Sequence, residues 1–456
     1  MATSARKAAF ADRVVIVFVT QVFGAAVGVV NGLLIARLLG PAAKGDYYLL
    51  VLVPSTAMVL IQLGLPQAFG FFAARGRLDG LVGKTVVLTV LLSLIAVVGV
   101  VVVLPVLQAD IFHGIALPLI LVAFLSLPLA LNATLTTGVV LGRQAVRWYA
   151  LINSAYPLAT TVLVIALLGY AGLGIGGALA IYLIASLIQT GGFLIAAARL
   201  HGDPDAAGGA VSYRDLFGYG LPFYPGSITI FFSYRADVFL LAWLLGTGAA
   251  APLGYYSLAV SFAELVFFFP NAVETLFFPH VAAATRDDAD RQVAVVTRVT
   301  LLLTGLVGLA LVPASIVLID LLLPAFQPSL PALFVLLPGV VALTATKVIT
   351  GYTTGLGMTS LTSNINVGAF MLNVVVNLLL IPGFGIEGAA AASLVSYTAS
   401  SVAFSLVAAQ ASHARVVDFW LPRASDLTLV VQRSAALLRR VFAAVRPGRV
   451  GSVEAP

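Results

Sequence analysis

Five charged residues lie inside long apolar segments of this chain, where they could bind ions, protons or anionic groups. They are Arg235, Asp237, Glu264, Glu274 and Lys347. A charge at the centre of a membrane-spanning helix costs about 2.5–3.5 kcal/mol on insertion scales. If these segments cross a membrane, each charge therefore needs a partner, a water-filled cavity or a function.

Arg235 and Asp237 are two residues apart, so a helix points them to different faces. The short connection near residues 249 and 250 places Arg235 and Glu264 at equal depth on successive helices. That geometry predicts an ion pair between the two side chains. The alternative interpretation is that Arg235 contacts an anionic substrate.

Lys347 and the polar residues near it each have two interpretations. Lys347 either reaches the cytoplasmic headgroups with its long side chain or acts as a cationic point charge for an anionic group at the inner mouth of a cavity. Asn366 and Asn373 either bind polar groups of a substrate or hold neighbouring helices together. Arg37, near the outer end of the first helix, either reaches the outer headgroups or attracts phosphate at an exit.

The composition is that of a membrane protein. The chain is 61% hydrophobic and 9% charged, whereas soluble domains carry about 25% charged residues. Unbroken apolar runs of helix-spanning length recur, and they differ from the short alternating segments of a barrel. The chain has no cysteine, and its four histidines show no ligand spacing, so we predict no metal site.

The apolar runs predict twelve membrane-spanning helices. Their approximate ranges are 14–38, 47–66, 84–107, 115–139, 147–169, 174–198, 217–245, 253–279, 296–321, 330–355, 361–382 and 386–411. Before the C-terminal tail, thirteen basic residues lie at one set of helix ends, and only Arg37 and Lys44 lie at the other. Basic residues in short loops stay in the cytoplasm, so we expect both termini there.

Three sequence anchors recur in the second part of the chain. "NGLLIARLLG" (31–40) aligns with "DVFLLAWLLG" (237–246), "TTGVVLG" (136–142) with "TTGLG" (353–357), and "GLGIGGA" (172–178) with "GFGIEGA" (383–389). Anchors in the same order at a nearly constant offset predict a duplication. Because each unit has an even number of helices, we expect two parallel six-helix halves around a central cavity, with substrate handled between them.

A polar stripe in the first helix should face that cavity. Gln21, Gly24, Gly28 and Asn31 follow helical spacing, and lipid would reject such a surface. At the offset of 206 residues, Asp237 takes the position of Asn31. We therefore expect Asp237 to face inward, as the carboxylate that could couple transport to H⁺ or Na⁺.

The predicted organisation has five parts. A cytoplasmic N-terminus (1–13) precedes the first six-helix half (14–199), and a cytoplasmic loop (200–216) connects it to the second half (217–411). In the basic tail (412–456), residues 427–446 place four arginines among aliphatic residues. The tail is either a basic interfacial helix on the membrane or a solvated, partly disordered segment.

These features resemble the multidrug/oligosaccharidyl-lipid/polysaccharide (MOP) exporter superfamily, and most of all its polysaccharide-biosynthesis (Wzx-type) flippases. The resemblance rests on the six-plus-six helices, the turn "ARLLGPAAKGDYY" (36–48) and the acidic position in the seventh helix. It implies a bacterial plasma membrane protein that moves undecaprenyl-pyrophosphate-linked oligosaccharide to the outer leaflet by alternating access. It also implies polysaccharide polymerase and glycosyltransferases as partners, besides membrane lipids, and no nucleic acid.

Two other classes of function remain open from the sequence. A cation-coupled multidrug antiporter of the same superfamily would use Asp237, although the first six helices have no acidic residue in their cores. An integral-membrane enzyme would need an outer loop carrying catalytic groups, and the outer connections are short. A phosphate-binding glycine loop followed by Lys and Ser or Thr does not occur. We therefore expect a transporter without catalytic residues or a cofactor.

Overall fold

The computed structural model describes residues 2–200, 210–283, 285–423, 425 and 426. In that part of the chain all regular structure is helical and no strand occurs. The helices are α1 (Ala2–Ile61), α2 (Leu65–Ala74), α3 (Leu81–Asp110), α4 (Leu117–Phe124), α5 (Ser126–Gly142), α6 (Val146–Leu163), α7 (Gly174–Ala198), α8 (Tyr213–Gly220), α9 (Tyr224–Leu245), α10 (Ala250–Glu264), α11 (Phe268–Ala283), α12 (Arg286–Leu322), α13 (Ser329–Gly355), α14 (Thr359–Ser412) and α15 (Val417–Trp420).

Two glycines divide the longest helices. Among the described residues, ten helical segments are long and apolar enough to cross a membrane. One of them contains Gly40 (φ 74°) and another contains Gly385 (φ 55°), a backbone conformation that glycine adopts without strain. In the second, Asn373 before the glycine donates a hydrogen bond to Ser396 after it, as the two arms of a hairpin require. Dividing both segments at these glycines gives the twelve predicted spans.

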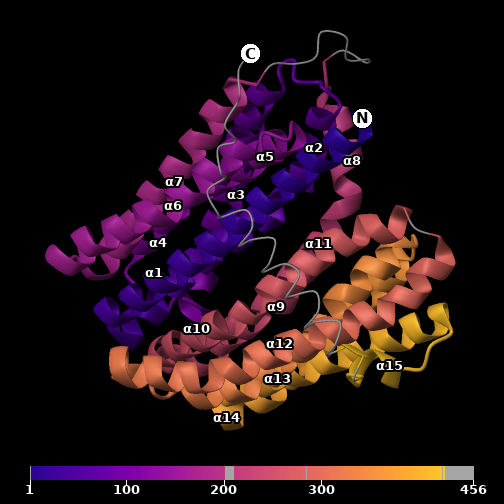
Figure 1. The fold of residues 1–456 in the computed structure, drawn as a ribbon. Helices are drawn as coiled ribbons and strands as arrows, with labels where there is room; N and C mark the ends of the chain where they lie inside the picture. Colours follow the sequence, from indigo (N-terminus) through magenta and orange to yellow (C-terminus); the bar gives the residue numbers. More distant parts are fainter. Residues whose placement is uncertain (1, 201–209, 284, 424, 427–456) are drawn as a thin grey trace, which may run out of the picture.

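The helices form two bundles, which Figure 1 shows as the indigo-to-magenta helices α1–α7 and the pink-to-yellow helices α9–α14. In one of the repeated anchors, the equivalent glycines Gly174 (φ 56°) and Gly385 (φ 55°) both have a positive φ. The predicted all-α architecture of two six-helix halves is therefore confirmed.

Helix α8 belongs to the first half. It begins inside the predicted connecting loop, where Ser212 and Asp215 form a reciprocal capping box. Its buried Leu216 packs in the same core as Leu65 and Phe69 of α2, and Tyr219 stacks on Phe71 with ring centroids 4.0 Å apart. The first half thus extends to Gly220, while residues 201–209 of the loop lie outside the described residues.

The two halves meet through a close crossing of α1 and α10. A Cβ on Gly45 would lie 1.9 Å from the carbonyl oxygen of Ala250, and a Cβ on Gly254 would lie 1.9 Å from that of Pro41. Each oxygen belongs to the residue four positions before the opposite glycine, so the contact is symmetric between the halves. Such backbone proximity requires residues without side chains. We call this region the Gly45 end of the bundle.

A buried ion pair fixes the segment that follows α14. Arg298 of α12 donates to both carboxylate oxygens of Asp426, at 2.8 and 3.2 Å, and to the carbonyl oxygen of Asp418 at 2.6 Å. The hydrogen bonds from Arg298 lower the pKa of the Asp426 carboxyl. Arg298, which the charge pattern places among the basic residues of one membrane face, is therefore buried and paired. The predicted tail helix (427–446) lies outside the described residues.

The Gly45 crossing can be tested with a single thiol, because the chain has no cysteine of its own. In a Ser257→Cys background, where position 257 is 2% exposed, Gly45→Val should accelerate maleimide labelling. Overpacking of the crossing by the valine side chain costs about 1–3 kcal/mol. This cost would raise the population of the state in which the crossing is open, and with it the labelling rate, about 5- to 150-fold.

Gly28→Ala is the matched control for this experiment, because no atom lies within 4 Å of a Cβ at that glycine. It should leave the labelling rate at the parent value. Equal labelling of Gly45→Val and its parent would show that the crossing does not hold the halves together.

Candidate functional site

A large cavity lies between the two halves. It has a volume of about 550 Å³, and we call it the amide chamber. Helices α1, α6 and α7 supply most of the wall, and α11 supplies the rest. The lining residues are Thr20, Gln21, Gly24, Ala25, Gly28, Asn31, Tyr149, Asn153, Tyr156, Pro157, Thr160, Gln189, Phe268 and Asn271.

A second cavity of about 210 Å³ adjoins the amide chamber, and we call it the lysine chamber. Ala25, Gly28 and Phe268 line both, so the two chambers share a wall. Its charged lining residues are Lys44 and Glu264. The cleft between the halves therefore has a neutral polar part and a charged part.

Lys44 is buried at the contact between the halves, where it is 7% exposed. Its Nζ donates a hydrogen bond to Ser257 Oγ at 2.9 Å and lies 6.0 Å from the centroid of the Phe326 ring. It forms an ion pair with no carboxylate of the described chain. The charge pattern of the sequence placed Lys44 at an outer helix end and gave it no role. Only the crossing of α1 and α10 brings it to the chamber wall.

Arg235 and Glu264 lie together, at the equal depth that the hairpin predicts. Arg235 Nη1 is 3.1 Å from Glu264 Oε1, with side chains 26% and 37% exposed. The same nitrogen donates to Tyr48 Oη at 3.3 Å. Because Tyr48 belongs to the first half and Glu264 to the second, Arg235 connects the halves near the Gly45 end.

Asp237 is enclosed by its own half. Its carboxylate accepts a hydrogen bond from the Tyr256 hydroxyl and another from Ser393 Oγ at 3.5 Å. It also accepts from the backbone N–H of Val238 at 2.9 Å. The carboxylate lines a separate space of about 10 Å³, whose wall includes Glu264, rather than either chamber. Glu264 lines both this space and the lysine chamber.

Asn31 occupies the equivalent position in the first half and holds α6. Its amide donates to the carbonyl oxygen of Pro157 at 2.9 Å and accepts from Thr161 Oγ1 at 2.7 Å. Unlike Asp237, Asn31 lines the amide chamber. Gln21, three helical turns earlier on the same stripe, lines it too.

Lys347 lies in an aromatic environment inside the second half. Its Nζ is 4.0 Å from Glu274 Oε2, 4.8 Å from the Phe267 centroid and 5.6 Å from the Tyr234 centroid. The side chain is 13% exposed. These contacts satisfy the ammonium within the protein, and Lys347 lines neither chamber.

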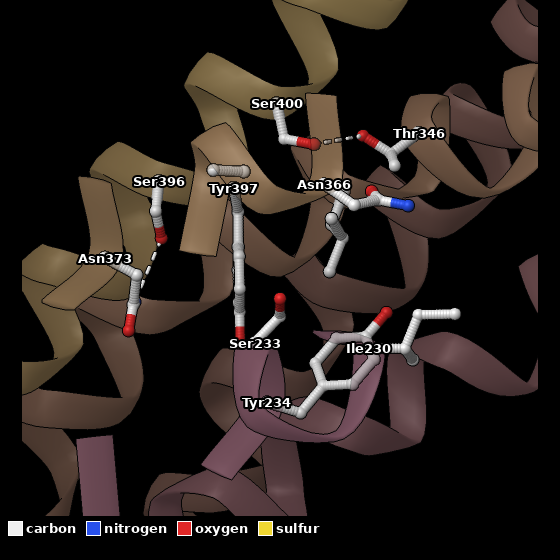
Figure 2. A pocket seen from close by; sticks show the side chains of 11 residues that line it. Ile230, Ser233, Tyr234, Thr346, Asn366, Asn373, Ser396, Tyr397 and Ser400 are labelled. Atoms are coloured by element: carbon white, nitrogen blue, oxygen red, sulfur yellow. Dashed lines mark hydrogen bonds between the residues drawn. The ribbon is translucent and has the colours of Figure 1, made fainter. Parts of the chain in front are cut away.

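Asn366 and Asn373 line a smaller cavity of about 50 Å³ in the second half, shown in Figure 2. Asn373 donates to Ser396 Oγ at 3.0 Å, so its amide is engaged in helix packing. Arg37 is exposed and lies on no cavity described above. The structure thus brings Asn31 and Gln21 to the amide chamber and places the other predicted residues outside it.

Several chamber residues escaped the sequence reasoning. Tyr149, Asn153 and Tyr156 follow helical spacing on α6, and Gln189 and Asn271 join them from α7 and α11. A stripe search of the fifth helix, like that made for the first, would have found three of them. Within the described residues, no group of three or more His, Cys, Asp or Glu side chains is placed to hold a metal ion.

Solved structures share this fold. The lipid II flippase MurJ in an inward closed conformation gives a TM-score of 0.69 at 14% identity, with 95% of this chain and 94% of that chain covered. A multidrug resistance MATE family transporter of the MOP superfamily gives 0.67 at 12% identity in its inward-facing conformation, covering 84% of this chain and 94% of that chain. An outward-facing MATE transporter of that superfamily gives 0.62 at 15% identity, covering 88% and 95%.

The two helical halves and the cleft between them thus give this chain the fold of these multi-pass membrane proteins. The chain belongs to the family of polysaccharide biosynthesis proteins, whose family model matches residues 10–283. No curated protein matches the sequence at a significant level.

The Arg235–Glu264 pair should be measurable by a double-mutant cycle. Buried pairs cost about 3–5 kcal/mol to break and exposed ones about 0.2–1 kcal/mol, so for this half-exposed pair we expect Glu264→Gln to cost about 1–2 kcal/mol. Adding Arg235→Gln should recover part of the loss, read as melting temperature in detergent.

Glu387→Gln serves as the control, because Glu387 forms no ion pair with a described residue and lies at the turn of α14. Its effect should add to that of Arg235→Gln without coupling. Additive effects of Arg235→Gln and Glu264→Gln would instead mean that the pair contributes nothing to stability.

Proposed function

We propose that the protein is a flippase that moves lipid-linked, undecaprenyl-pyrophosphate-type oligosaccharide from the inner to the outer leaflet for cell-surface polysaccharide biosynthesis. Membership of the polysaccharide biosynthesis family supports this proposal. The shared fold with the lipid II flippase, a protein named for a lipid-linked substrate, agrees with it.

The observation that carries the proposal is the composition of the cleft. A neutral, amide-rich chamber of about 550 Å³ adjoins a chamber that contains Lys44. Side-chain amides donate and accept hydrogen bonds as sugar hydroxyls do, and a lysine attracts phosphate oxygens as a point charge. Both chambers lie between the halves, which is where transporters with parallel repeats handle substrate.

The mechanism that we propose is alternating access. The crossing at Gly45 and Gly254 closes one end of the cleft. We place this end outside and both termini in the cytoplasm of a bacterial plasma membrane, following the distribution of basic residues. Rocking of the half at 14–199, with α8 attached, against the half formed by α9–α14 would then open the outer end.

Asp237 is our candidate for coupling to H⁺ or Na⁺. Its side chain is 4% exposed, and its contacts are hydroxyls and a backbone N–H, with no cation among them. Through Glu264, its small enclosed space adjoins the lysine chamber. Polysaccharide polymerase and glycosyltransferases are the protein partners that this function would require.

Reconstitution gives the direct test of the proposed function. Purified protein in proteoliposomes should move a labelled lipid-linked oligosaccharide between leaflets, read as loss of protection from an impermeant oxidant. Protein-free vesicles and a labelled phospholipid are the controls. Ion-driven drug efflux without movement of the lipid-linked sugar would instead identify a multidrug antiporter.

Asp237→Asn should remove the response of transport to an imposed H⁺ or Na⁺ gradient, because an amide cannot exchange a proton and binds cations weakly. Asp110→Asn, at an exposed helix end, should leave the response intact. Unchanged gradient-driven transport by Asp237→Asn across a wide pH range would exclude this carboxylate as the coupling group.

A further inference from the structure

We propose that the amide chamber selects glycans whose enclosed sugars carry no charge and discriminates against acidic sugars such as uronic acids. This inference rests on the proposed flippase function and adds a substrate class to it. The protein would then serve a polysaccharide with a neutral repeat unit.

The wall of the chamber has no ionisable acid or base apart from phenols. None of its fourteen lining residues is Asp, Glu, Lys, Arg or His. Amide side chains come from four helices, with Gln21 on α1, Asn153 on α6, Gln189 on α7 and Asn271 on α11. A sugar carboxylate in this chamber would find no cation opposite it.

The polar groups of the wall suit hydroxyls. The side chains of Gln21, Gln189, Tyr149 and Tyr156 form no hydrogen bonds with described residues and are available to a ligand. Each amide offers donors and an acceptor, and each phenol can do both. A sugar hydroxyl also both donates and accepts hydrogen bonds, whereas a carboxylate only accepts them. A carboxylate in place of a hydroxyl would therefore donate no hydrogen bond to the amide carbonyl oxygens.

A backbone oxygen strengthens this preference. Pro157 has no N–H, so the carbonyl oxygen of Asn153, four residues earlier, lacks its helical partner. Gly24 on α1 faces this oxygen, since a Cβ there would lie 3.7 Å away. The chamber therefore contains an acceptor that favours a hydroxyl and repels a carboxylate.

The charged groups of the cleft lie in the neighbouring chamber. Lys44 and Glu264 line the lysine chamber, which shares only Ala25, Gly28 and Phe268 with the amide chamber. Arg235 is paired with Glu264 and does not line the amide chamber. The phosphate of a substrate can thus be attracted by Lys44 while its sugars meet a neutral wall.

The test compares two substrates that differ by one group. Both carry the same lipid and the same number of sugars, and one enclosed sugar is glucose in the first and glucuronic acid in the second. Proteoliposomes with the native chain should flip the neutral lipid about ten-fold faster, as expected when one charged group loses its partners. Arg291→Gln, which removes an exposed charge in the first turns of α12 and outside both chambers, should keep this ratio.

A cation added to the wall should weaken the preference. Gln189→Lys should lower the neutral-to-acidic ratio several-fold, chiefly by faster flipping of the acidic lipid. Gln21→Lys, on α1, gives a second variant if the first does not fold.

Each outcome decides between the hypotheses. Equal flipping of both lipids by the native chain, or a ratio that neither lysine variant changes, would overturn the selectivity while leaving the flippase function standing. Failure to flip either lipid by a monodisperse native protein would overturn the proposed function and the selectivity with it.

Discussion

Contact between two backbones, made possible by the absence of side chains at Gly45 and Gly254, determines how the rest of this molecule is arranged. At this crossing the halves approach so closely that a methyl group on either glycine would meet a carbonyl oxygen. The contact places Lys44 against Ser257 and brings Tyr48 within reach of Arg235. The lysine chamber lies beside this contact, because Lys44 next to Gly45 lines it.

Among the described residues, charged side chains inside the bundle are paired or hydrogen-bonded by neighbouring side chains, with one exception. Arg235 is paired with Glu264 and Lys347 with Glu274, and Asp237 is held by hydroxyls within its own half. These groups are satisfied where they lie, as the cost of an unpaired charge in a membrane demands. Lys44 differs, because a single serine hydroxyl is its hydrogen-bond partner. The interior charge least neutralised by the protein is therefore the one at the junction of the two halves.

Sequence reasoning succeeded where chain geometry alone decides the outcome. Helix length and hydropathy gave the spans, the glycine turns gave the hairpins, and equal depth in one hairpin brought Arg235 beside Glu264. It did less well where packing between distant helices decides. The charge pattern placed Lys44 among basic residues at helix ends. For Lys347 the sequence left two interpretations, and in the structure its ammonium lies beside the aromatic rings of Tyr234 and Phe267. Gln189 and Asn271 belong to helices whose contribution to the chamber becomes evident only once the halves are assembled.

The buried pair of Arg298 and Asp426 attaches the C-terminal end of the described chain to the second half. Arg298 belongs to α12, so residues up to Asp426 are anchored to the second half alone. In the proposed rocking motion, Asp418 and Asp426 would therefore travel with α12 as one rigid unit of the second half.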